Sequence, residues 1–183
     1  MTTLKRRKLG LTHSTSESAG GYTLYAPLTG NGYVPLIDEG GDVVHEWNMP
    51  VRPGRHAEIL ESGNLAYNGS HAKSMDLYPP WDIWHGGHFM EANQKGDIVW
   101  EYEDPYHHHD AQWLDDGLLY TAAAEYKDKI SDIVKIVDRN GDIVWEWRAW
   151  EYLTEEECAQ TGVPIILSSG MSDWKMIEDA INT

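Results

Sequence analysis

Short apolar runs, separated by turn residues, recur along most of the chain. Three segments share one pattern: an apolar run, a glycine followed by aspartate, and a second run ending in an acid and an aromatic residue. Glycine reaches positive φ without steric cost and β-branched pairs favour strands, so each copy predicts a tight β-hairpin. The copies cover residues 36–47, 92–102 and 136–147. Repeats of roughly 40–50 residues built from short strands are typical of propeller blades.

A second kind of hairpin alternates with the first. Apolar segments flank turns at residues 62–64 and 116–117. Aligning the two turn glycines pairs one histidine-bearing dipeptide with another, Arg55-His56 with His109-Asp110. We therefore expect a histidine to precede equivalent strands in successive repeats.

The pattern divides the chain into three parts. Residues 1–20 are expected to be a flexible lead-in, and residues 21–150 a partial β-propeller of about three antiparallel blades, with one further strand at 130–137. Residues 151–183 combine an apolar run, a Ser-Ser-Gly loop and apolar residues at helical spacing. The expected fold class is therefore all-β, with a short C-terminal strand-loop-helix tail.

Composition narrows the classes of partner. The 183 residues include 14 basic and 30 acidic side chains, a net charge of −16, which argues against binding to nucleic acid or to an anionic membrane. No apolar segment approaches the ~18 residues of a transmembrane helix, and the N-terminal basic run lacks a signal-peptide core. One cysteine cannot form an internal disulfide, so we expect a cytoplasmic protein. Nine Trp and ten Tyr suit packed sheet faces or an aryl-binding cleft.

Histidines are the main candidates for chemistry. They form two groups: Arg55 with His56, and the run His107-His108-His109-Asp110. A neutral imidazole is a nucleophile near its pKa of ~6.5, and a cation beside it can stabilise developing negative charge. Strand alternation would place His107 and His109 on one side and His108 on the other. Asp110 would then fix a histidine tautomer.

Each candidate has a simpler alternative. Three adjacent histidines are often only an exposed loop, or bind metal adventitiously. His85 and His88 would make two metal ligands, but no cysteine or further acid nearby completes a tetrahedral set. The turn at 138–142 is similar to a calcium loop, yet Ile143 and Ala149 stand where that loop needs Gly and Glu, so a hairpin explains it better. No metal and no cofactor are predicted.

Residues 9–153 resemble the arylsulfotransferase family of β-propellers. The resemblance rests on the ordered phrases Gly21-Tyr-Thr-Leu-Tyr, Val44-His-Glu-Trp, His109-Asp110 and Asp142-Ile-Val-Trp-Glu-Trp-Arg-Ala-Trp. It implies blades around a central funnel, and transfer of a sulfuryl group between phenols through a sulfated histidine. It also implies particular residues and a ligand: catalytic His56, His108 and His109, substrate-binding Arg55 and Asp110, and a small aryl or sulfate-bearing ligand.

The resemblance covers only the first half of a typical family member. We therefore expect either an arylsulfotransferase-like fragment, or a non-catalytic remnant that binds a ligand or associates with itself. In the second case a homo-oligomer would complete the ring. Residues 159–183 instead resemble a fragment of the sialic acid synthase family's barrel, and one βα unit cannot supply that enzyme's activity.

Overall fold

The computed structural model describes residues 13, 15–74, 86–127 and 129–152. Within them the chain forms eleven strands and the four-residue helix α2, so the predicted all-β character is confirmed. No helix in this part is long and apolar enough to cross a lipid bilayer. The expected lead-in falls mostly outside these ranges. The C-terminal strand-loop-helix and the segment resembling a barrel fragment lie wholly outside the described residues.

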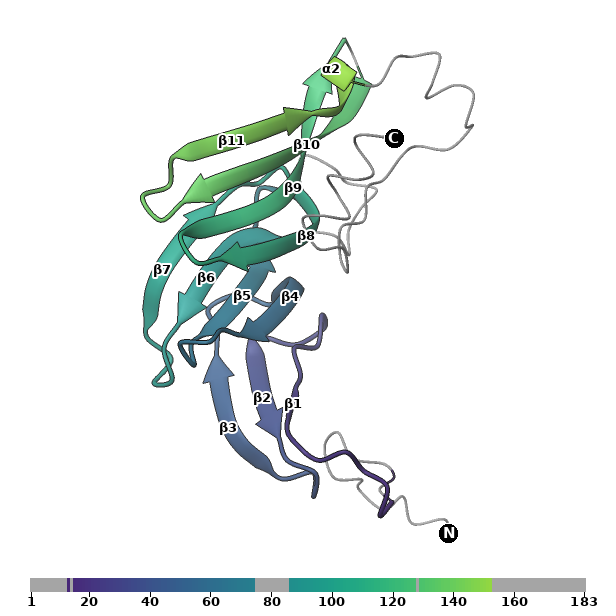
Figure 1. The fold of residues 1–183 in the computed structure, drawn as a ribbon, viewed down its shortest axis with the longest axis vertical. Coiled ribbons are helices and arrows are strands. Elements are labelled where there is room, and N and C mark those ends of the chain that lie inside the picture. The colour runs from purple at the N-terminus through teal and green to yellow at the C-terminus, as the bar shows by residue number, and fades with distance from the viewer. Residues whose placement is uncertain (1–12, 14, 75–85, 128, 153–183) are drawn as a thin grey trace.

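The strands form three antiparallel sheets in chain order, which we call the first (β1-β2-β3), middle (β4-β5-β6-β7) and third sheet (β8-β9-β10-β11). Every strand pairs with its neighbour in sequence, so each sheet is a meander. The sheets follow one another along the long axis, with β3 and β7 at the left edge of the first two sheets and β8 nearest the middle sheet in the third (Figure 1). The bounds are β1 Thr23–Leu24, β2 Tyr33–Ile37, β3 Val43–Asn48, β4 Pro53–Ile59, β5 Leu65–Ser70, β6 Gly87–Ala92, β7 Ile98–Glu103, β8 His107–Leu114, β9 Gly117–Tyr126, β10 Lys129–Asp138, β11 Ile143–Arg148 and α2 Ala149–Tyr152.

The three Gly-Asp segments are hairpin turns, as predicted. They join β2 to β3, β6 to β7 and β10 to β11, and their glycines have φ values of 77°, 87° and 89°, which only glycine adopts readily. In each turn the glycine N–H donates to the carbonyl three residues earlier: Gly41 to Asp38, Gly96 to Asn93, and Gly141 to Asp138. The same turn therefore joins the last two strands of each of the three sheets.

The middle sheet is buried on both faces because its side chains alternate between two neighbours. On one face, Leu65, Tyr67 and Met90 pack against Val34 and Trp47 of the first sheet and its flanking residues. All five side chains are at most 2 % exposed. Burial of such side chains stabilises the fold by about 1.5–3 kcal/mol each, so this contact fixes the first sheet against the middle one.

The other face of the middle sheet packs against the third sheet. Phe89 lies at its centre, with its ring centroid 5.2 Å from that of Tyr120 and 6.0 Å from that of Trp113. Ala66 and Leu118 complete this core. The two sheet-to-sheet contacts bring the first strands of the middle and third sheets, β4 and β8, close together at one edge of the stack.

Candidate functional site

The edge strands β4 and β8 carry the same irregularity. Between Pro53 and Ala57, three residues of β4 face a single residue of β5, and between His107 and Ala111, three residues of β8 face a single residue of β9. Such bulges break the strand alternation and redirect side chains, often beside functional sites. The bulges contain the two dipeptides that the sequence paired: Arg55-His56 in β4 and His109-Asp110 in β8.

The five predicted site residues lie in these two bulges and influence one another electrostatically. Burial lowers the pKa of Arg55 to about 10, against the opposing effect of the nearby Asp110 carboxylate, so Arg55 remains a cation at neutral pH. The pKa of His56 is raised, chiefly by Glu58, whose Oε2 lies 3.8 Å from Nε2 of His56. Partial burial lowers this pKa, but by less. Asp110 adds to this effect on His56, so the acid in β8 favours positive charge on both Arg55 and His56.

Asp132 in β10 joins the cluster through His108. Its Oδ1 lies 3.1 Å from Nε2 of His108, and Nδ1 of His108 lies 2.8 Å from Nδ1 of His109. The 3.1 Å separation is that of an ion pair, since its geometry does not make a hydrogen bond at Nε2 of His108. Between the two Nδ1 atoms one imidazole donates and the other accepts, and where Nδ1 of His109 donates, the lone pair of His109 lies on Nε2. The three side chains thus lie in sequence, with the carboxylate at one end and His109 at the other.

His109 has an unusual backbone. Its φ of 63° lies in the left-handed region, which is costly for a residue with a Cβ and is found most often at functional sites. The pKa of His109 is lowered by burial and then by the nearby His108 and Arg55, and this shift favours the neutral imidazole. A neutral imidazole with a defined lone pair is the form that attacks an electrophile.

The prediction that His107 and His109 share one side is wrong. The rings of His108 and His109 contact each other edge to face at 4.9 Å, while His107 turns into the core. The cause is the β8 bulge, because two extra residues and a left-handed φ interrupt the alternation of a regular strand.

His107 is a structural residue. Its Nδ1 lies 2.7 Å from the carbonyl oxygen of Thr121 and its Nε2 lies 2.8 Å from Nδ2 of Asn68. Because the carbonyl can only accept, Nδ1 carries the proton and Nε2 accepts from the Asn68 amide. Both ring nitrogens are therefore used, and complete burial lowers the pKa of His107 to about 3.

We expect His107 to make the protein sensitive to acid. Its pKa is about 3 in the folded state and near 6.5 in the unfolded chain, so between these values the unfolded state binds the extra proton. This group alone should lower the free energy of unfolding by about 1.4 kcal/mol for each pH unit below 6.5. NMR titration should show a His107 ring signal that does not shift between about pH 8 and pH 5, the range in which an ordinary histidine titrates. A His107 signal that titrates near 6.5 would contradict this assignment.

Asp132 was not among the residues proposed from the sequence. Asp110 was expected to fix a histidine tautomer, but the carboxylate at hydrogen-bonding distance from a histidine ring of this cluster is that of Asp132, while Asp110 Oδ1 accepts the N–H of Ala111. The available signal was an acid between the apolar residues Ile130 and Ile133 of a predicted strand. Such an acid needs a partner, although the sequence alone does not name it.

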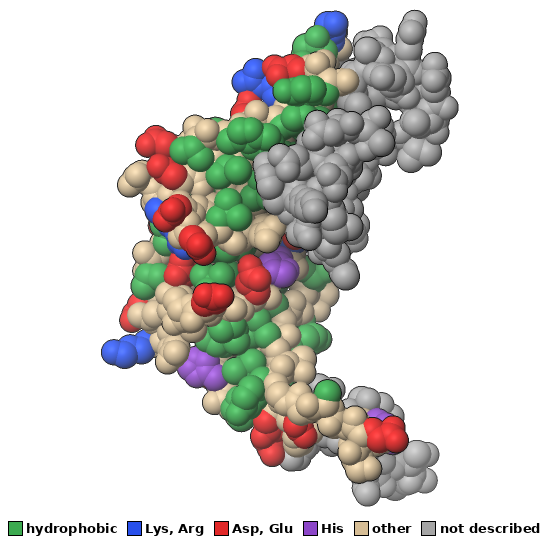
Figure 2. Space-filling view, in the orientation of Figure 1, with side chains coloured by type: hydrophobic (Ala, Val, Ile, Leu, Met, Phe, Trp, Pro, Cys, Tyr) green, Lys and Arg blue, Asp and Glu red, His purple; other side chains and the backbone are tan. Residues whose placement is uncertain are grey.

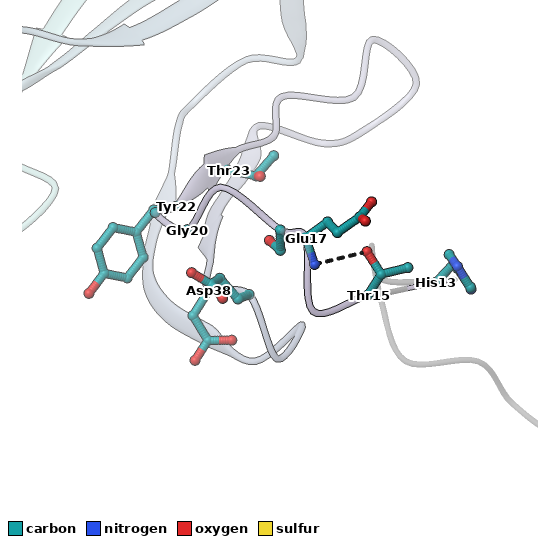
Figure 3. Close-up of a pocket in the computed structure, with 10 residues that line it drawn as sticks. His13, Thr15, Glu17, Gly20, Tyr22, Thr23 and Asp38 are labelled. Carbon is teal, nitrogen blue, oxygen red and sulfur yellow. Dashed lines mark hydrogen bonds between the residues drawn. The ribbon is translucent and has the colours of Figure 1, made fainter.

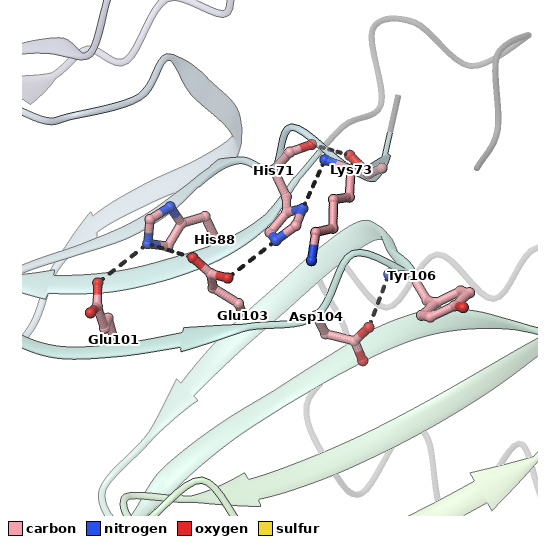
Figure 4. Close-up of polar contacts among 8 residues, drawn as sticks. His71, Lys73, His88, Glu101, Glu103, Asp104 and Tyr106 are labelled. Carbon is pink, nitrogen blue, oxygen red and sulfur yellow. Dashed lines mark hydrogen bonds and ion pairs between the residues drawn. The ribbon is translucent and has the colours of Figure 1, made fainter. Parts of the chain in front are cut away.

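A second group of histidines and acids lies on and beside β6 and β7 (Figure 4). His71 Nε2 lies 3.3 Å from one oxygen of Glu103, and His88 Nε2 lies 3.6 Å from the other and 3.4 Å from Glu101. Nδ1 of His71 accepts the N–H of Lys73, so Nε2 carries the proton and donates to Glu103. Among the described residues no three His, Cys, Asp or Glu side chains are placed to hold a metal ion. His85 lies outside those residues.

An open depression of about 480 Å³ lies beside the first sheet (Figure 3). Its walls are formed by the segment before β1 and by the β2–β3 turn, with Glu17, Asp38 and Glu39 as acidic lining residues. None of the five candidate residues lines it, and its acidic lining disfavours anions. The histidine cluster therefore remains the best candidate for a functional site.

Comparison with known proteins adds no family assignment. No protein-family model matches the chain, and no curated protein matches it.

Proposed function

We propose that the three sheets are consecutive blades of a partial β-propeller, and that the cluster on β4 and β8 transfers a sulfuryl group from a phenolic sulfate to a phenol. The proposal follows the arylsulfotransferase-like phrases of the sequence. Its main support is the pair of matching bulges, which gathers Arg55, His56, His108, His109 and Asp110 at one edge. A structural role alone does not require the same two-residue bulge in both strands with a histidine in each.

His109 is the proposed nucleophile. Its Nε2 lone pair attacks sulfur, the S–O bond to the aryl group breaks, and the phenolate leaves with the bonding electrons. The product is a zwitterionic N-sulfoimidazole with its positive charge on the ring, and no proton is needed to balance this step. A second phenol then attacks sulfur, the S–N bond breaks, and His109 returns to its starting form as the phenol's proton is released to water.

The neighbouring charges suit this reaction. In the proposed ordered chain, Nδ1 of His109 donates to His108, whose Nε2 lies 3.1 Å from Asp132, so the positive charge that forms on His109 meets a carboxylate through one imidazole. Arg55 is the cation available for the sulfate oxygens, and His56, whose pKa is raised, adds a second positive charge when it is protonated. The lowered pKa of His109 favours the neutral imidazole, whose lone pair no proton blocks.

The test is sulfuryl exchange between a chromogenic phenyl sulfate and phenol, catalysed by the pure protein. We expect turnover by the wild type and an acid-labile adduct of one SO₃ group on the peptide that carries His109. Replacing His109 with glutamine should remove both. His88→Gln is the matched control, because His88 is also a partly buried strand histidine but belongs to the other cluster, and it should leave turnover unchanged.

The outcomes separate the two functions proposed from the sequence. Turnover that persists in His109→Gln would assign the nucleophile to another residue and contradict the mechanism. Saturable binding of phenyl sulfate without turnover, weakened by Arg55→Gln, would instead support a ligand-binding module. Absence of both binding and turnover in a folded protein would exclude the cluster as a site for aryl sulfates.

A further inference from the structure

Each bulge of the histidine cluster is faced by one buried polar residue of the neighbouring strand. Asn68 is the residue of β5 that faces the β4 bulge, and Thr121 is the residue of β9 that faces the β8 bulge. Their exposed fractions are 0 % and 5 %. A buried polar side chain is unfavourable unless it is hydrogen-bonded. The hydrogen bonds of these two residues therefore indicate what holds the bulges in shape.

The hydroxyl group of Thr121 binds the backbone on both sides of His109. Its Oγ1 donates to the carbonyl oxygen of His108 and accepts the N–H of Asp110 at 3.4 Å. The carbonyl oxygen of Asp110, 3.3 Å from Oγ1, is an alternative acceptor of the same proton. The His108 carbonyl and the Asp110 N–H belong to the two planar peptide units that meet at the Cα atom of His109. One hydroxyl thus restrains both backbone dihedral angles of His109.

This restraint acts on an unfavourable conformation. The φ of 63° at His109 is costly for a residue with a Cβ atom and persists only where the surrounding structure holds it. A bulge also interrupts the ladder and leaves backbone groups without their usual partners. Thr121 replaces such partners immediately before and after His109. Its hydroxyl therefore opposes the return of this segment to a regular strand.

The contact between two histidine rings depends on the same conformation. In a regular strand consecutive side chains point to opposite faces, so neighbours in sequence cannot touch. In the bulge, Nδ1 of His108 lies 2.8 Å from Nδ1 of His109, and the ring centroids are 4.9 Å apart. This edge of the stack is accessible, because histidine and acidic side chains lie together at the surface over β4 (Figure 2).

His107 connects Thr121 to the residue that faces the other bulge. Nδ1 of His107 donates to the carbonyl oxygen of Thr121, and Nε2 accepts from the amide of Asn68. Oδ1 of Asn68 in turn accepts the N–H of Gly87 at 3.1 Å. The backbone of Thr121 is therefore tied to the middle sheet, and its hydroxyl is held where it meets the β8 bulge.

We propose that Thr121 is a positioning residue of the histidine cluster. Its hydroxyl holds His109 in the left-handed conformation, and this conformation brings the His109 ring against that of His108. Thr121 acts through the backbone of the bulge and does not touch the substrate. Its effect on turnover rests on the proposed sulfuryl transfer, whereas its effect on the two rings does not.

The first test compares the ring nitrogens of Thr121→Val with those of the wild type by NMR. Valine keeps the shape of the side chain and removes the hydroxyl. At about pH 8, above the ordinary histidine pKa, the wild type should show one proton shared between the two Nδ1 atoms of His108 and His109. Thr121→Val should lose this signature and Thr121→Ser, which keeps the hydroxyl, should retain it. Thr23→Val is the matched control, because it makes the same change at an exposed strand threonine of the first sheet.

The second test measures sulfuryl exchange. Thr121→Val should lower kcat about 10²-fold with little change in KM, because a reacting group displaced by on the order of 1 Å loses about that much rate. Thr121→Ser and Thr23→Val should retain most of the wild-type kcat. A wild type without turnover would remove the proposed function, and the ring-nitrogen comparison would still decide the role of Thr121.

Circular dichroism and urea unfolding show whether Thr121→Val is folded; if it is not, Thr121→Ala takes its place. A folded variant without the hydroxyl that keeps the wild-type ring-nitrogen signals would overturn the proposal. Loss of these signals in Thr121→Ser would also overturn it, because the methyl group would then be responsible. In the wild type, the Asp110 amide should exchange slowly with deuterium, and exchange at the rate of an exposed amide would contradict its bond to Thr121.

Discussion

Replacing Asp104 with alanine should destabilise the folded protein by about 3–5 kcal/mol, because it leaves a buried cation without its partner. Asp104 Oδ2 lies 2.8 Å from Nζ of Lys135 and accepts a hydrogen bond from the Tyr120 hydroxyl at 2.8 Å. The side chains of Asp104 and Lys135 are only 7 % and 14 % exposed. The acid follows β7 and both partners belong to the third sheet, so this network joins the middle sheet to the third.

Urea unfolding measures the effect, with Asp115→Ala as the control. Asp115 lies in the exposed β8–β9 turn, so its loss should change the free energy of unfolding by less than about 0.5 kcal/mol. Combining Asp104→Ala with Lys135→Met should recover part of the lost stability, because both charges are then absent. A difference of under 1 kcal/mol (roughly the value of an exposed ion pair) between Asp104→Ala and the control would show that the network contributes little.

Asp132→Asn should lower the rate of sulfuryl exchange about 10³–10⁴-fold, if the proposed function holds, while leaving the fold intact. Asparagine removes the charge that stabilises the cation formed on His109. It can also donate to Nε2 of His108, which would reverse the order of donors and acceptors and move the His109 lone pair to Nδ1. Asp132 acts through His108, so it is a positioning residue.

A structural role for Asp132 would show a different pattern. We expect kcat to fall with little change in KM, and the free energy of unfolding to stay within about 1 kcal/mol of the wild-type value. Asp116→Asn, in an exposed turn, is the matched control and should leave kcat unchanged. A loss of activity that parallels a loss of stability, or a loss below tenfold, would count against the ordered chain from Asp132 to His109.

The hairpins could be predicted because their determinants are local. A glycine before an aspartate, with β-branched residues on either side, specifies a turn and two strands without knowledge of the rest of the chain. The predicted strand at 130–137 is confirmed within β10 for the same reason. Aligning Gly63 with Gly117 also placed Arg55-His56 opposite His109-Asp110, and the structure shows these pairs in equivalent bulges.

The site could be predicted only in outline because its details depend on register. Successive side chains point to opposite faces only in a regular strand, where each residue pairs with one residue of its neighbour. The β8 bulge interrupts this pairing at His107 to His109. Asp132 reaches His108 across β9, from a strand that follows later in the chain. Neither the bulge nor this cross-strand distance has a signal in the amino-acid sequence.

The paired bulges also hinder the addition of a foreign strand to these sheets. The strands β4 and β8 are sheet edges, and a regular edge presents an unbroken row of N–H and C=O groups to which a foreign strand can add. Two inserted residues interrupt that row in both strands. The distortion that brings the histidines together thus also makes this flank a poor template for amyloid-like growth.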